Sequence, residues 1–255
     1  MRPVRLLHTS DVHLGSGGFP RPKHGEHLDE CLCPLDAIAA AVDQHRPDLV
    51  VVAGDLFDHQ RVTAELVDGV LDRLARLEPT CVLINGNHDL HDDRSLYPTG
   101  ETLSADELVF LDRLDGHTVE VLDGAVHLWG KAMDDHHRGF RPLHGIPPRP
   151  RPDAWWVAVG HGHFEPTEDA ASIRSSPLTS ADIEATGADY VALGHWHVQT
   201  DVSTDSVTAW YSGAPYGFGA TGRFNLVDLD PRTGTSVTPV EVQLPAQGCG
   251  PPTTG

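Results

Sequence analysis

Five short segments of this chain group side chains that can bind divalent metal ions. They are Asp11-Val12-His13, Gly54-Asp55-Leu56-Phe57-Asp58, Gly86-Asn87-His88-Asp89, Gly160-His161-Gly162-His163 and Gly194-His195-Trp196-His197. Carboxylate, amide oxygen and imidazole nitrogen are donors that hard-to-borderline divalent ions accept. Each segment alone has a structural interpretation, such as a turn cap or a polar strand exit. Whether these segments are structural turns or metal-binding sites therefore depends on where they lie relative to the predicted strands.

The elements predicted around these segments place all five at the ends of strands. Short apolar runs predict strands over Val4–Thr9, Leu49–Ala53, Cys81–Ile84, Trp155–Val159 and Tyr190–Leu193. One metal-binding segment follows each run or occupies its end. Since ligands of open α/β sheets bind at the carboxyl ends of the strands, the five segments are expected to converge there.

Helices between the first three strands complete a β-α-β-α-β series. Apolar periodicity predicts one helix within Leu28–His45, ending before Pro47, and another near Thr63–Leu77. The segment Leu90–Gly116 is predicted as an irregular insertion with one helix around Ala105–Leu114. This alternation predicts an α/β fold with a sheet covered on at least one face.

Strands dominate the second half of the chain. They are predicted over Val119–Leu122, Val126–Trp129, Val207–Tyr211, Phe224–Leu229 and Val237–Leu244. Asp123-Gly124 lies between the first two and is a hairpin signal. The adjacent tryptophans Trp155-Trp156 are predicted core residues. We expect a single domain over residues 1–244 and a disordered Gly-, Pro- and Thr-containing tail over residues 245–255.

Composition excludes several classes of protein. No apolar run approaches the roughly 20 residues of a membrane span, and no signal-length apolar stretch follows Met1, so a cytoplasmic location is expected. The four cysteines form neither a disulfide framework nor a thiolate zinc pattern, which predicts reduced thiols. With 37 acidic and 18 basic residues, the formal charge of −19 argues against a broad electrostatic grip on nucleic acid. A local contact with nucleic acid remains compatible with this net charge.

Taken together and in this order, the five segments resemble the signature of the calcineurin-like metallophosphoesterase superfamily. Within it, the chain looks most like the SbcD-type DNA-repair exonucleases. Four sequence segments carry this second resemblance: Thr9-Ser10-Asp11-Val12-His13-Leu14-Gly15, Ala53-Gly54-Asp55-Leu56-Phe57-Asp58, Ala192-Leu193-Gly194-His195-Trp196-His197 and Tyr211-Ser212-Gly213-Ala214-Pro215. The resemblance covers roughly residues 4–244 and implies a four-layer α/β/β/α sandwich with mixed sheets.

The resemblance also implies a centre of two divalent metal ions. Asp11, His13 and His197 would hold the first ion with Asp55, while Asn87, His161 and His195 would complete the second. A carboxylate can bridge two ions about 3.5–4 Å apart, and Asp55 is the natural bridge. Manganese is the expected ion, although iron, zinc and nickel tolerate the same ligands. A water between two such ions loses its proton near neutral pH and serves as the nucleophile.

Three further assignments concern residues beside these ligands. The resemblance implies that His88 faces the substrate and protonates the leaving oxygen or stabilises the charge on phosphorus. Asp58 looks like the carboxylate that orients His88. His161 and His163 stand two apart, so either could be the ligand by position alone. The family spacing favours His161, and Asp89 and the His136-His137 pair are predicted to be structural.

The substrate expected from the resemblance is DNA, as single strands or ends, and the main alternative is a nucleotide or another small phosphoester. SbcD-type chains carry a capping domain and a segment that docks on an ATPase partner, so an SbcC-like partner is an open question. Arg138-Gly139-Phe140-Arg141 and Arg149-Pro150-Arg151 could contact a phosphate backbone or form a solvated loop. Tyr211, Tyr216 and Phe218 could stack on a base.

Overall fold

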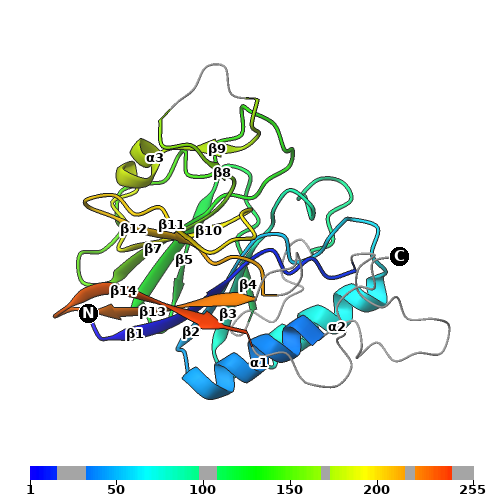
Figure 1. Cartoon of the computed structure of the whole chain (residues 1–255), viewed down its shortest axis with the longest axis horizontal. Helices are drawn as coiled ribbons and strands as arrows, with labels where there is room; N and C mark the ends of the chain where they lie inside the picture. The colour runs from blue at the N-terminus through cyan, green and yellow to red at the C-terminus, as the bar shows by residue number, and fades with distance from the viewer. Residues whose placement is uncertain (16–32, 98–107, 168–172, 216–221, 243–255) are drawn as a thin grey trace.

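Two six-stranded sheets packed face to face form the centre of the fold (Figure 1). The structure is a computed structural model that describes residues 1–15, 33–97, 108–167, 173–215 and 222–242. The first sheet has the order β14-β13-β1-β2-β3-β4. Its strands are β1 (Val4–Thr9), β2 (Leu49–Ala53), β3 (Thr80–Ile84), β4 (Leu108–Phe110), β13 (Arg223–Asp230) and β14 (Gly234–Glu241). Strands β1 to β4 are parallel, and β13 runs antiparallel to both β1 and β14.

The second sheet has the order β11-β12-β10-β7-β6-β5. Its strands are β5 (His117–Val121), β6 (Val126–Gly130), β7 (Trp155–His161), β10 (Tyr190–Gly194), β11 (Thr200–Asp201) and β12 (Thr208–Tyr211). The four central strands are parallel, and an antiparallel strand closes each edge. A small parallel pair, β8 (His163–Phe164) and β9 (Pro177–Leu178), lies beyond the carboxyl end of β7.

Helices cover the outer faces of the two sheets. Helices α1 (Cys33–His45) and α2 (Ala64–Ala75) lie along the first sheet, and the short α3 (Ser180–Ala185) lies by the second (Figure 1). Thr63 caps α2 by accepting a hydrogen bond from the backbone N–H of Leu66, 3.2 Å away. Among the described residues, no helix combines the length and the apolarity needed to cross a bilayer.

Apolar side chains that alternate along the strands hold the layers together. In β1, Leu7 packs with α1 and α2, whereas Val4 and Leu6 pack between the two sheets. On the far side, Trp156 of β7 packs with Ile183 of α3. The predicted α/β/β/α sandwich with mixed sheets is therefore confirmed, and both predicted core tryptophans are buried.

Strand β4 corrects one prediction. The helix expected around Ala105–Leu114 is not formed by its described part, because Leu108–Phe110 adds a parallel strand to the edge of β3. Burial of Leu108 and Leu111 against the sheet outweighs the weak local preference for a helix. The proposed tail, residues 245–255, lies outside the described residues.

Arg149 ties together the amino ends of two central strands of the second sheet. Its guanidinium contacts Asp189 at 2.7 Å and the carbonyl of Ala154 at 3.2 Å, directly before β10 and β7. Because β7 spans seven residues, this end lies about 20 Å from the metal-binding segment at its other end. Arg151 pairs with Asp153 in the same loop. Arg149 therefore braces the fold, and the Arg149–Arg151 segment does not border the predicted metal site.

We expect Arg149→Ala to lower the free energy of unfolding by about 1–3 kcal/mol, because it removes charged hydrogen bonds from a partly buried position. Urea unfolding followed by tryptophan fluorescence measures this change. Arg151→Ala is the matched control and should change stability by less than about 1 kcal/mol, since its ion pair is exposed. Equal effects of the two substitutions would contradict the bracing role of Arg149.

Candidate metal centre

The carboxyl ends of five parallel strands meet where the two sheets adjoin. Strands β1, β2 and β3 contribute from the first sheet, and β7 and β10 from the second. The loops bond directly to one another: the backbone N–H of Asp11 donates to Gly54 O at 3.0 Å, and that of His195 donates to the Asp11 carboxylate at 3.1 Å. The convergence predicted from the strand positions is therefore present.

Backbone conformation at the site is unusual. Asp11, His13, Asp55 and His195 have positive φ angles of 54°, 51°, 53° and 104°. Such values are uncommon for residues other than glycine and tend to cluster at functional sites. Gly194 allows the loops to touch, because a Cβ there would clash with the carbonyl oxygen of Ala53. The strands thus end in strained turns that aim polar side chains at a shared point.

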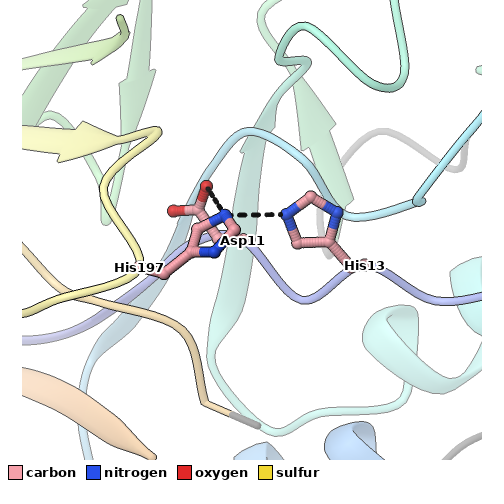
Figure 2. Close-up of side chains that lie close together, drawn as sticks. All are labelled: Asp11, His13 and His197. Atoms are coloured by element: carbon pink, nitrogen blue, oxygen red, sulfur yellow. Dashed lines mark hydrogen bonds and ion pairs between the residues drawn. The ribbon is translucent and has the colours of Figure 1, made fainter. Parts of the chain in front are cut away.

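Asp11, His13 and His197 form the first group of candidate ligands (Figure 2). Their ligand atoms all lie within 4.8 Å of one another. The Nε2 atoms of His13 and His197 are 3.2 Å apart, and His197 Nε2 is 3.7 Å from Asp11 Oδ1. Three donors that converge in this way can surround one cation.

Asn87, His161 and His195 form the second group. Asn87 Oδ1 lies 3.1 Å from His161 Nε2 and 2.8 Å from His195 Nδ1. Asp55 lies between the two groups, since its Oδ2 is 3.2 Å from His161 Nε2 and 3.8 Å from His13 Nε2. All seven predicted ligands are thus brought together in the expected arrangement, and metal binding by them stays a prediction.

The structure distinguishes His161 from His163. His161 is buried and donates from Nδ1 to Ala53 O at 2.9 Å, which directs Nε2 toward Asp55. His163 is only partly buried, and its Nδ1 accepts a hydrogen bond from Trp196 Nε1 at 3.2 Å. The geometry therefore favours His161 as the ligand, in agreement with the family spacing.

The electrostatics of the site favour a cation. Burial raises the pKa of Asp11, and the charge of Asp55 adds to this effect against the opposing charge of His161. Burial also opposes ionisation of Asp55, but His161 and His13 outweigh it and lower its pKa. In turn, Asp55 overcomes burial and raises the pKa of His161 to about 9. A protonated imidazole thus supplies the charge that two buried carboxylates require, and the donor set fits divalent ions.

The carboxylate of Asp58 lies near two histidines of the site. Its Oδ1 lies 3.0 Å from His13 Nδ1 but 3.7 Å from His88 Nδ1. His88 instead donates from Nδ1 to the backbone carbonyl of Asp58 at 2.7 Å. The carboxylate therefore contacts both imidazoles, more closely that of the candidate ligand His13, and the backbone of the same residue also holds His88. The orienting role of Asp58 toward His88 stays a prediction. Sequence spacing could not separate these two roles because both imidazoles face one residue.

Asp89 fixes the loops that carry Asp55 and Asn87. Its carboxylate accepts hydrogen bonds from the backbone N–H groups of Leu56 at 2.9 Å and Gly86 at 2.6 Å, and from the hydroxyl of Tyr97. This agrees with the predicted structural role of Asp89. Tyr97 was not anticipated, since no motif marks a buried tyrosine that completes a carboxylate shell.

Of the three aromatic residues expected to stack on a base, one is buried and two lie outside the described residues. Tyr211 is fully buried and donates its hydroxyl to Gly162 O at 2.7 Å, so it cannot stack on a base. Tyr216 and Phe218 lie outside the described residues. The ring of His136, expected to be structural, lies 5.6 Å from that of His195 and borders the site.

Comparisons with known proteins agree with this geometry. The profile of the family described as calcineurin-like phosphoesterase matches residues 4–199. A curated relative, the SbcD component of the nuclease SbcCD from Bacillus subtilis (strain 168), is 28% identical over 281 residues, covering 94% of this chain and 70% of the relative. The crystal structure of TT1561 of Thermus thermophilus aligns with a TM-score of 0.61 at 11% identity, covering 94% of this chain and 99% of that one. A second crystal structure gives 0.60 at 11% identity, covering 94% and 100%.

Metal binding should release protons at neutral pH. The pKa of His161 is raised from 6.5 to about 9, so the metal-free ring is protonated at pH 7 and must lose that proton to become a ligand. Apparent affinity should therefore rise with pH and level off above about pH 9. Without metal, the same shift stabilises the fold fully below pH 6.5 and is lost as pH rises through 9. Manganese titration by calorimetry in two buffers of different ionisation enthalpy measures the release; heats that are independent of the buffer would contradict it.

Asp58→Ala should weaken metal binding about 10–100-fold, because the carboxylate that orients His13 is lost. Competition with a fluorescent chelator measures the affinity. Asp68→Ala, at an exposed position on α2, is the matched control and should bind metal as the wild type does. Full metal affinity with reduced turnover in Asp58→Ala would assign the carboxylate to His88 instead.

Proposed function

Because the chain belongs to the calcineurin-like phosphoesterase family, we propose that it is a nuclease that uses two divalent metal ions to hydrolyse phosphodiester bonds in DNA. The observation that carries the proposal is the 28% identity to a nuclease subunit along 94% of this chain. The convergence of the seven candidate ligands supports the metal-dependent part, with manganese as the expected ion. Single strands and DNA ends are the proposed substrates.

The bound ions and the protein's own ligands would have different roles in the reaction. When bound, two divalent ions would attract the phosphoryl group and lower the pKa of a water molecule. The backbone N–H groups of His195 and His88 donate to the carboxylates of Asp11 and Asp55 and hold them in place. The protein thereby supplies a preorganised pocket of oxygen and nitrogen donors for cations.

His88 is the proposed proton donor to the leaving oxygen. Its side chain is 41% exposed, whereas the neighbouring candidate ligands His13 and His161 are 4% and 1% exposed. Because Nδ1 donates to the carbonyl of Asp58, Nε2 is the atom that can reach a substrate. The exposure of this ring at the edge of the candidate metal centre suits a group that meets the substrate.

The charge of the chain restricts the kind of DNA that it can hold. A protein of formal charge −19 makes few phosphate contacts outside its metal centre, so binding should depend weakly on salt, with a slope of about −0.7 per neutralised phosphate on single strands. Flexible single strands and frayed ends can place one phosphate in the centre without a long basic track. We therefore favour these substrates over blunt duplex.

The same acidity favours one alternative, a phosphoesterase for nucleotides or other small esters. Such a substrate needs no basic surface at all. The two functions differ in whether DNA competes for the site, which a direct comparison of substrates resolves.

The relative's name describes one subunit of a nuclease complex. A second chain of the SbcC-like ATPase type is therefore a candidate partner. Co-expression with an ATPase of that type from the same genome, followed by size-exclusion chromatography, tests it. Separate elution at micromolar concentration would contradict the partnership.

The manganese-loaded protein should cleave single-stranded DNA faster than blunt duplex, and His88→Ala should lower turnover about 10²–10⁴-fold while keeping both metals. Gel assays of labelled DNA measure cleavage, and elemental analysis measures metal. Arg151→Glu is a charge-reversal control that should cleave DNA normally, because Arg151 lies at the far end of the sheet. Mononucleotides or small diesters that turn over orders of magnitude faster, with DNA failing even to compete, would establish the alternative.

A further inference from the structure

His163 is a histidine beside the candidate metal centre that the proposed ligand set leaves unused. Its Nδ1 accepts the indole N–H of Trp196 at 3.2 Å. An indole nitrogen can only donate, so Nδ1 of His163 carries no proton and the neutral ring carries its proton on Nε2. His163 therefore presents a hydrogen-bond donor of fixed identity.

The surroundings of His163 hold the ring in place. Trp196 stacks on Tyr211 with ring centroids 4.7 Å apart and planes at 14°. Tyr211 is fully buried, and its hydroxyl donates to Gly162 O at 2.7 Å. The backbone N–H of His163 donates to Ser176 O at 2.9 Å. A donor supported by this many contacts binds a ligand with little loss of side-chain entropy.

The position of His163 suits an anion next to the scissile phosphate. Its ring lies 6.0 Å from that of His195, at an interplanar angle of 82°. Because Nδ1 is occupied by the indole N–H of Trp196, the Nε2–H of the neutral ring is the donor that a phosphate oxygen can accept.

We propose that His163 forms a second phosphate subsite, in which its Nε2–H donates to the phosphate one nucleotide away from the bond that is cleaved. Trp196 is the positioning residue that fixes the ring and its proton. This inference rests on the proposed function, since it assigns to the same site a substrate with successive phosphates. It gives this acidic protein a way to prefer a polynucleotide over an ester with a single phosphate.

The test compares two inhibitors that differ by one phosphate. Hydrolysis of bis(p-nitrophenyl) phosphate by the manganese-loaded protein is inhibited with adenosine 5′-monophosphate or adenosine 3′,5′-bisphosphate. The wild type should bind the bisphosphate about 10-fold more tightly, the scale of one hydrogen bond to a charged group. His163→Ala should lose this preference, while its turnover of the small diester and its metal content stay unchanged.

Two substitutions separate a subsite from a packing effect. His163→Gln keeps an N–H donor of similar reach and should retain part of the preference. Trp196→Phe keeps a ring on Tyr211 but removes the indole N–H, so it should weaken the preference without changing metal content. His144→Ala, at an exposed histidine after β6, is the control and should behave as the wild type.

The outcomes also separate this inference from the nuclease proposal. A wild type that binds both inhibitors equally, or a His163→Ala variant that keeps the preference, would overturn the subsite whatever DNA assays show. Loss of metal in His163→Ala would make the residue a ligand and overturn it too. A preserved bisphosphate preference in a protein that cleaves no DNA would support the subsite and reject the nuclease function.

Discussion

Burial of two carboxylates at one point is the constraint on which this structure depends. Asp11 and Asp55 are almost fully buried, at 0% and 1% exposure, where the two sheets adjoin. Removing a charge from water is costly unless opposite charge and hydrogen bonds replace the lost hydration. The backbone of His195 and of His88 donates to the two carboxylates, and His161 adds positive charge. The whole arrangement of loops thus serves to keep anionic oxygens buried and to pair them with cations.

The fold meets this constraint through parallel strands from two different sheets. Parallel neighbours end at the same edge, so each turn after a strand delivers its side chain to the same region. Close approach of the turns requires Gly86, where a Cβ would clash with the carboxylate of Asp55. The layered packing of β2, which is buried along its whole length, makes these turns rigid. Local strain at the turns is offset by the apolar core below them.

The strands that could be predicted from the sequence are those marked by a run of apolar residues. Leu49–Ala53 is a continuous apolar run and Val4–Thr9 is centred on apolar residues, and the predicted bounds agree with those of β2 and β1. The ligand positions follow because each stands within four residues of the end of such a predicted strand. The two-residue strands β8 and β9 are too short to show periodicity, and β4 depends on a neighbour that only the folded chain supplies. The orientation of a side chain at a turn is likewise set by contacts distant in sequence, so the sequence did not reveal that Asp58 also contacts His13.

The histidines of the site differ in role because their Nδ1 atoms have different partners. Donation from Nδ1 to Ala53 O turns Nε2 of His161 inward to Asp55, and donation to the Asp58 carboxylate turns Nε2 of His13 toward His197. A neutral imidazole has one donor and one acceptor nitrogen, so a partner at Nδ1 fixes what Nε2 can offer. At His163 the partner of Nδ1 is a donor, so Nε2 carries the proton of the neutral ring. A protonated ring nitrogen cannot bind a metal ion. The indole N–H of Trp196 thus makes His163 suited to bind phosphate, whereas His161, two positions earlier, is suited to bind metal.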